Sequence, residues 1–186
     1  MIDVGPVAGM ILPFFFGFMW IAAIVVNGNW TLGEDTLSEL GGQVPSRWIF
    51  NSATIVSGAM GAIFSTALYL KFRSEFLGRA GGALMTLASI FLILVGVFPI
   101  DTGTPHSIAS VAFFGLAALS VITIEFPLRN AVGLGGIPSV VTIAILAVSF
   151  SSLLIPSIPF AEAVATSGLL IWILTLSASM KLGHLR

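Results

Sequence analysis

The chain has 186 residues, of which 57% are hydrophobic and 8% are charged, and its mean hydropathy is +1.10. A water-soluble domain carries roughly a quarter charged residues, so this composition excludes a soluble globular protein. The formal net charge is −1, and the seven lysine and arginine residues are scattered, which leaves no basic stripe for nucleic acid. We therefore expect membrane lipids, and not nucleic acid, as partners.

The cysteine and histidine content limits the chemistry further. The chain has no cysteine, which excludes disulfides, thiolate nucleophiles and cysteine-ligated metal sites. It has two histidines, too few for a catalytic zinc site with three histidine ligands. We expect no cofactor.

Six apolar runs, taken in chain order, predict six transmembrane helices. About 20 residues cross the hydrocarbon core of a bilayer, so this length has room for about six spans and no separate soluble domain. The expected fold class is all-α: a polytopic membrane protein that forms a compact bundle of six transmembrane helices, as one domain over residues 1–186. The expected spans are residues 5–27, 47–70, 78–98, 105–126, 136–155 and 161–180.

The basic residues of the loops predict the orientation. Six spans put both termini on one side, and most of the cationic side chains fall on that side. Positively charged loops stay in the cytoplasm, so we expect both termini to be cytoplasmic and the protein to lie in the cell membrane. The residues on the side of the termini are Lys71, Arg73, Arg79, Arg129, Lys181 and Arg186, whereas Arg47 lies opposite.

Two charged residues near the inner end of the fourth span suggest a structural pair. Glu125 and Arg129 are four residues apart, with Pro127 between them. We interpret Pro127 as the end of the helix and the two charged residues as a local ion pair.

The longest outer loop, residues 28–46, is too polar to insert into the membrane, yet it contains leucines. In Asp35-Thr36-Leu37-Ser38 a capping residue is followed by another polar residue three positions later. We expect the loop to lie on the membrane surface with Leu37 and Leu40 facing lipid. The alternative is a capped entry into the second helix with no further role.

The tight outer turn between the third and fourth spans places a histidine near a carboxylate. His106 and Ser110 are four residues apart and share a helical face, and Asp101 comes from the turn above them. A hydroxyl, an imidazole and a carboxylate suit acyl transfer, with His106 as the base and Asp35 or Asp101 orienting it. The candidate catalytic residues are Asp35, Ser38, Asp101, His106 and Ser110. The alternative is a histidine that satisfies a neighbouring polar group inside the membrane.

Other polar residues in the outer halves of the helices predict a wet pocket open to the outside. The candidate substrate-binding residues are Glu39, Arg47, Asn51 and Glu162. With the candidate catalytic residues, they would bind or modify a lipid head group.

Other functions stay open at this point. One is a small proton- or cation-coupled transporter or channel with Glu162, Asp101 and His106 at its mouth, and another is an assembly subunit that binds another membrane protein or its own copies. We expect no metal, although Asp35, Glu39, Asp101 and His106 offer three oxygen ligands and one nitrogen to a divalent ion.

The two outer loops also carry a family resemblance. The residues concerned are Asp35-Thr36-Leu37-Ser38-Glu39-Leu40-Gly41, Ile49-Phe50-Asn51, Gly96-Val97-Phe98-Pro99, His106 and Phe113-Phe114. In these residues the chain resembles domain-of-unknown-function family 998, small six-helix membrane proteins of bacteria and archaea. The resemblance implies the helical fold and the importance of Asp35, Ser38 and His106, and it supplies no reaction. More remotely, Leu37-Ser38-Glu39-Leu40-Gly41 and a histidine starting the fourth helix are similar to the Frag/DRAM/Sfk membrane proteins, some of which are linked to remodelling of lipid-anchored glycans.

Overall fold

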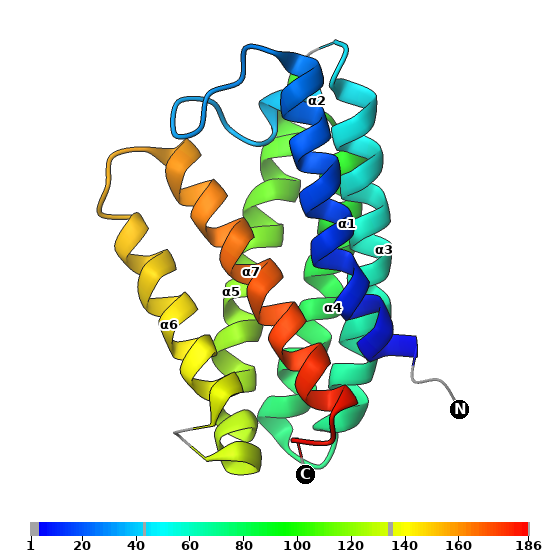
Figure 1. Cartoon of the computed structure of the whole chain (residues 1–186), viewed down its shortest axis with the longest axis vertical. Coiled ribbons are helices and arrows are strands. Elements are labelled where there is room, and N and C mark those ends of the chain that lie inside the picture. The colour runs from blue at the N-terminus through cyan, green and yellow to red at the C-terminus, as the bar shows by residue number, and fades with distance from the viewer. Residues whose placement is uncertain (1–3, 43, 134–135, 186) are drawn as a thin grey trace.

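The computed structural model describes residues 4–42, 44–133 and 136–185, and over these residues the chain is a bundle of helices without strands (Figure 1). The expected all-α class is confirmed. The elements are α1 (Val4–Asn27), α2 (Glu39–Gly42), α3 (Arg47–Lys71), α4 (Phe76–Val97), the 3-10 turn η1 (Ile100–Thr102), α5 (Thr104–Val132), α6 (Ile137–Ser152) and α7 (Ile158–Lys181).

The expected number of six helices is wrong. Within the described residues there are seven α-helices, because the outer loop contains α2, a single turn of four residues that has no hydropathy signal of its own. Five helices, α1, α3, α4, α5 and α7, are long and apolar enough to cross a membrane. Helix α6 lies at the remaining predicted span, but its 16 residues are fewer than a full crossing usually takes.

Helix α5 continues past the expected end at residue 126 to Val132, so Pro127 lies inside the helix. Beyond the proline, Leu128 is fully buried in the core. The predicted ion pair is present, with Arg129 Nε 3.5 Å from Glu125 Oε1. Packing of this last turn compensates for the backbone hydrogen bond that a proline removes.

The helices form a bundle in which sequence neighbours lie side by side. Helix α3 packs against α4 and α4 against α5, whereas α1 contacts both α3 and α7, and α6 contacts α5 and α7. The start of α1 and the end of α7 lie at one end of the bundle, which we call the inner end. The segment that contains α2 covers the opposite end, the outer end (Figure 1).

Small residues allow α3 and α4 to approach closely. A Cβ atom on Gly58 would lie 2.8 Å from the carbonyl oxygen of Ser89, and one on Gly82 would lie 2.6 Å from Cα of Tyr69. Backbones that approach this closely gain van der Waals contact, which is the main source of helix association in lipid.

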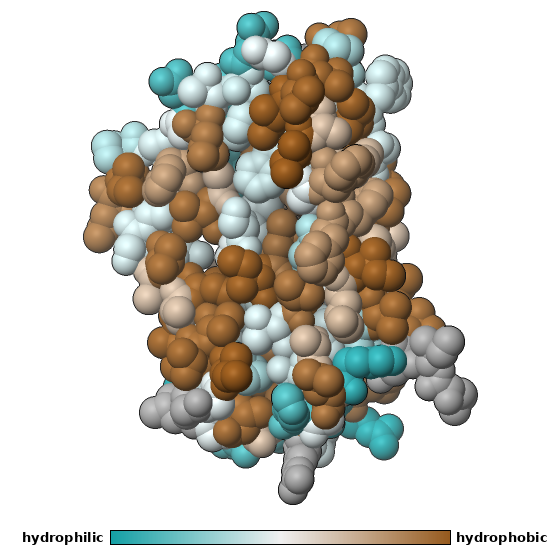
Figure 2. Space-filling view, in the orientation of Figure 1, coloured by the Kyte–Doolittle hydropathy of each residue, from teal (hydrophilic) through white to brown (hydrophobic). Residues whose placement is uncertain are grey.

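The outside of the bundle is apolar along the helices. Large side chains such as Phe14, Phe18 and Val111 are exposed there. Figure 2 shows apolar side chains over the length of the helices on one face, with hydrophilic side chains gathered towards the two ends. Such a surface matches the hydrocarbon core of a bilayer and not water.

Candidate functional site

The outer loop folds inward over the end of the bundle. Leu37 is 3% exposed and Leu40 is fully buried, and both belong to a cluster with Phe16 of α1 and Phe50 of α3. The expectation that these leucines face lipid is therefore wrong. Lipid offers no hydrogen-bond partners to the polar backbone of a loop. The helix ends beneath the outer loop offer such partners, for example the side chains of Glu162 and Ser157.

Carboxylates of the loop hold its own backbone in place. Asp35 Oδ2 accepts a hydrogen bond from the Thr31 backbone N–H (2.7 Å), and Glu39 Oε2 accepts one from the Thr36 N–H (2.6 Å). The indole Nε1 of Trp30 donates to the carbonyl oxygen of Thr36 (2.8 Å). Asp35 and Glu39 thus satisfy backbone donors at a turn and at the start of α2, in the manner of capping residues.

Helix α2 is fixed to the start of α3. Asn51 Nδ2 donates to the carbonyl oxygen of Gly41 (3.0 Å), and Ser46 Oγ donates to that of Leu40 (2.9 Å). A Cβ atom on Gly41 would collide with the Asn51 side chain. The amide of Asn51, a candidate substrate-binding group, is engaged here by the loop.

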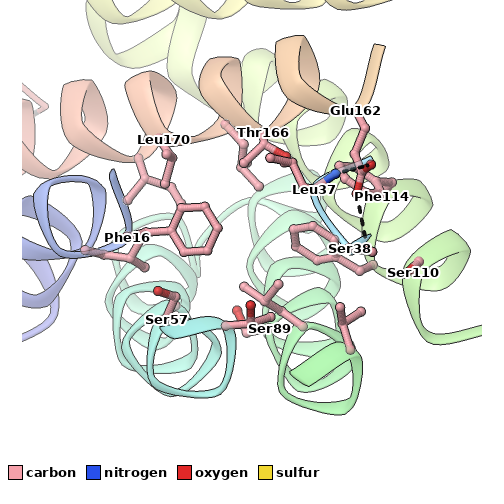
Figure 3. A pocket seen from close by; sticks show the side chains of 18 of the residues that line it. Phe16, Leu37, Ser38, Ser57, Ser89, Ser110, Phe114, Glu162, Thr166 and Leu170 are labelled. Carbon is pink, nitrogen blue, oxygen red and sulfur yellow. Dashed lines mark hydrogen bonds between the residues drawn. The ribbon is translucent and has the colours of Figure 1, made fainter. Parts of the chain in front are cut away.

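Glu162 connects the loop to α7. Its Oε2 accepts a hydrogen bond from the Leu37 backbone N–H (3.0 Å), and its Oε1 accepts one from Ser38 Oγ (3.4 Å), as Figure 3 shows. Ser157 Oγ, at the start of α7, donates to the carbonyl oxygen of Gly33 (2.8 Å). The structure therefore brings Ser38 and Glu162 together, although 124 residues separate them in the sequence.

His106 is buried near the start of α5, and its two ring nitrogens have different partners. Nδ1 lies 2.7 Å from the carbonyl oxygen of Phe98, and Nε2 lies 3.1 Å from Ser110 Oγ. A carbonyl oxygen accepts hydrogen bonds and never donates, so Nδ1 carries the proton of the neutral ring. Nε2 is then the acceptor, and the Ser110 hydroxyl donates to it. Helix α4 ends at Val97, just before Pro99, and this leaves the Phe98 carbonyl available to the histidine.

Neither Asp35 nor Asp101 orients His106, contrary to expectation. Asp101 forms an ion pair with Arg47, with Nη2 3.0 Å from Oδ2, and the two side chains are 49% and 31% exposed. Asp35 is bonded within its own loop. A backbone carbonyl takes the orienting place because it reaches the buried ring, whereas Asp101 lies at the exposed rim.

A cavity extends from the outer loop between α1, α3, α4, α5 and α7. It leaves about 60 Å³ for the centres of water-sized molecules. Figure 3 shows Ser38, Ser110 and Glu162 at one end of it, and Ser57 and Ser89 across from α7. Its walls are otherwise mostly apolar and include Leu12, Phe16, Phe50, Met85, Leu92, Val95, Phe113, Phe114, Leu169, Leu170 and Ile173.

The hydroxyl of Ser57 faces this cavity without a hydrogen-bond partner in the part of the chain that the structure describes. Two neighbouring hydroxyls are satisfied within their own helices, since Thr54 donates to the Phe50 carbonyl and Ser89 to the Met85 carbonyl (2.8 Å each). An unpaired buried hydroxyl costs roughly 1–3 kcal/mol. A water molecule, or a polar atom of a bound molecule, would remove this cost.

The inner end holds a buried glutamate, Glu125. Ser139 of α6 donates to Glu125 Oε1 (2.5 Å), the oxygen that also faces Arg129. Nearby in α6, Thr142 Oγ1 accepts from Trp172 Nε1 of α7 (3.1 Å). These bonds link α5, α6 and α7, which supports the structural role predicted for Glu125 and Arg129.

The proposed metal ligands and the proposed transporter mouth do not form clusters. In residues 4–42, 44–133 and 136–185, no three histidine, aspartate or glutamate side chains are placed to hold one metal ion. Asp101 pairs with Arg47, His106 bonds Phe98, and Glu162 bonds the outer loop. Asp101, His106 and Glu162 therefore bind three different partners and do not form one metal site or one transporter mouth.

Sequence reasoning missed most of the cavity. It also missed Phe98, which does not line the cavity but accepts a hydrogen bond from His106 through its carbonyl oxygen; the signal for it was the proline that follows. Ser57 and Phe16 gave no signal, because a serine or phenylalanine inside an apolar helix gives no sign of facing an empty space.

The comparisons with known proteins agree with the resemblance of the outer motifs. A family model described as "Protein of unknown function (DUF998)" matches residues 7–179, from α1 nearly to the end of α7. A comparison with curated proteins and with solved structures finds no match, so the remote likeness to the Frag/DRAM/Sfk proteins stays a prediction. With five helices fit to cross a bilayer, the chain is an integral membrane protein and belongs to the DUF998 family.

Proposed function

We propose that this protein binds the polar end of a membrane lipid in the cavity beneath its outer loop. The observation that carries the proposal is the distribution of polarity in the cavity: Ser38, Ser110 and Glu162 lie at one end, and the remaining walls are mostly apolar. The polar end of a lipid-like molecule, together with the first carbons of its hydrocarbon chain, has the same distribution. The unpaired Ser57 hydroxyl supports occupancy, because a bound molecule or water would satisfy it.

The test is photo-crosslinking in lipid nanodiscs. A lipid that carries a diazirine near its polar end should label residues that line the cavity, identified by mass spectrometry. A variant that fills the cavity, Ser89→Leu, should label weakly. The matched control is Ser52→Leu, which makes the same change at an exposed position of α3. Equal labelling of Ser89→Leu and the native chain, or labelling confined to the outer surface, would contradict the proposal.

Acyl transfer is a second candidate function, favoured by the bond from the Ser110 hydroxyl to His106 Nε2. In this reaction Ser110 Oγ attacks the carbonyl carbon of a lipid ester, and its proton passes to Nε2. The leaving alcohol takes that proton as its bond to the acyl carbon breaks, and water then hydrolyses the acyl-serine. The Phe98 carbonyl holds the ring in the tautomer that this step requires.

A serine-reactive fluorophosphonate tests this second candidate. Covalent labelling of Ser110, lost in Ser110→Ala and His106→Gln, is the expected result. Ser107→Ala is the matched control, because Ser107 lies on the same turn of α5 and bonds the Gly103 carbonyl instead. If Ser110 is not labelled in the folded native chain, acyl transfer is excluded, while lipid binding is unaffected.

We also propose that the protein lies in the cell membrane with both termini in the cytoplasm, supported by the basic residues near the inner end. The chain has no cysteine, so single cysteines report topology without a background. A membrane-impermeant maleimide should label Glu34→Cys in intact cells and should label Arg73→Cys only after the cells are opened. The reverse pattern would contradict the proposed orientation.

A further inference from the structure

We propose that the cavity selects a small polar end that donates hydrogen bonds, and that it favours a protonated amine over an anionic group. This inference rests on the proposed function and names the chemical class of the ligand. It follows from the charge at the polar end of the cavity, from where the cations of the chain lie, and from the size of the space.

Glu162 is the one ionisable side chain among the described residues that line the cavity. The other polar groups there are hydroxyls, and the walls are otherwise apolar. The two carboxylate oxygens already accept hydrogen bonds, from the Leu37 N–H and from Ser38. This end of the cavity therefore presents oxygen acceptors to an incoming group, and the carboxylate of Glu162, when ionised, is the one charge that the described lining carries.

No cation of the described chain lines the cavity to balance this charge. Arg47 is the basic residue at the outer end, and it is paired with Asp101. The others lie at the inner end, in or next to the first or last turns of the helices there, namely Lys71, Arg73, Arg79, Arg129 and Lys181. A phosphate or carboxylate entering the polar end would meet a like charge in surroundings that screen it poorly, whereas an ammonium group would meet its counter-ion.

The size of the space limits the polar end. A volume of about 60 Å³ for water-sized centres accommodates only a few water molecules, because each needs roughly 10–15 Å³ of such volume. This is the volume of the whole cavity, so it takes a primary amine or a hydroxyl with the first carbons of its chain, but not a phosphodiester head group. Both smaller groups donate hydrogen bonds, and the amine also carries positive charge.

The experiment compares amphiphiles that share one chain and differ at the polar end. The native protein in nanodiscs is photo-labelled with a dodecylamine derivative that carries a diazirine, and unlabelled dodecylamine, dodecanol, laurate and dodecyl phosphate compete. We expect the amine to compete best, the alcohol next, and both anions at least about tenfold more weakly than the amine, as expected for a hydrogen bond to a buried charge. Anions that compete as well as the amine would overturn the inference.

Variants locate the source of the preference. Glu162→Gln should remove the difference between amine and laurate, whereas Glu162→Asp should keep its sign. The matched control is Glu34→Gln, which removes the same charge from an exposed position in the outer loop and should leave the preference unchanged. A preference that persists in Glu162→Gln overturns the inference.

The two proposals fail in different ways. Competition without regard to charge, with labelling still inside the cavity, overturns the charge preference and leaves lipid binding intact. If none of the four amphiphiles competes, lipid binding in the cavity fails and the charge preference fails with it. Because the four competitors are first compared on the native chain, the result does not depend on whether a variant folds.

Discussion

The two ends of the bundle each hold a glutamate that is partly or fully buried, and the two carboxylates have different kinds of partner. Glu125 at the inner end has a cation, Arg129, and a hydroxyl from α6, and it does not line the cavity. Glu162 at the outer end has two uncharged donors, lines the cavity and has no ion pair within the described residues. A carboxylate that only joins helices is best neutralised by a cation of the chain, whereas one left without a cation is available to a ligand.

The two ends also differ in how closely their side chains pack. At the inner half, Trp172 is fully buried against Phe64, with ring centroids 6.3 Å apart, and its indole nitrogen is bonded to Thr142. The cavity runs from the outer end past the middle of the bundle, as far as Leu12, Met85 and Ile173, and Ser57 faces it unpaired among the described residues. The comparison indicates that side chains pack closely around Trp172 and that the helices leave a space beneath the outer loop. Buried polar atoms without a partner among the described residues occur in both regions, since Glu125 Oε2 and Ser177 Oγ at the inner end are also unpaired.

The largest expected effect lies at the inner half. Trp172→Ala should lower the free energy of unfolding by about 3–5 kcal/mol, because it creates a void and leaves Thr142 without its donor. Leu170→Ala, at the wall of the cavity, should cost about half as much, since Leu170 is half-buried and already borders empty space. Thermal unfolding in detergent micelles measures both. Equal losses would remove the proposed difference in packing.

A smaller effect tests how the outer loop is attached. Gly41→Ala should destabilise the protein by about 1–3 kcal/mol, because the added methyl group collides with Asn51 and pushes α2 away from α3. Hydrogen exchange should then rise in residues 31–42 and stay unchanged at the inner end. Gly115→Ala is the control, since a Cβ there meets no atom within 4 Å. A uniform rise in exchange would show that the loop and the bundle are a single unit.

Two serine substitutions compare a hydroxyl that has a hydrogen-bond partner with one that has none among the described residues. Ser120→Ala should cost about 1 kcal/mol, because Ser120 Oγ donates to the Gly81 carbonyl across α4 and α5 (2.8 Å). Ser57→Ala should leave the stability unchanged or raise it by up to about 1 kcal/mol in detergent without lipid, because it removes an unpaired hydroxyl. A loss for Ser57→Ala equal to that of Ser120→Ala would mean that the Ser57 hydroxyl has a partner, such as a retained water.

The smallest effect is expected at the exposed rim. Arg47→Gln removes the ion pair with Asp101, and both side chains are partly exposed, so the free energy of unfolding should change by at most about 1 kcal/mol. High salt should reduce even this difference, because salt screens exposed charges. A larger loss that resists salt would place Arg47 among the residues that hold the outer end together.

The membrane character, the all-helical class and the positions of the long helices to within a few residues, with α5 as the exception, could be predicted from the sequence. These follow from hydropathy along the chain, because a bilayer demands long apolar segments whose backbone bonds are internal. The ion pair of Glu125 and Arg129 was also predictable, since residues four apart on a helix are neighbours. Local spacing likewise brought His106 and Ser110 together.

The contacts of the outer motifs could not be predicted from the sequence and are seen only in the folded chain. The spacing of the acidic residues does not predict their partners. Asp35 accepts from a backbone N–H of its own turn, Glu39 accepts from one just before α2, and Asp101 pairs with Arg47. The bond between Ser38 and Glu162 joins residues far apart in the sequence, and the burial of Leu37 depends on aromatic side chains from two helices. Hydropathy fixes which segments enter the membrane, but the partners of a polar group and the space left between helices depend on how side chains from several helices pack together.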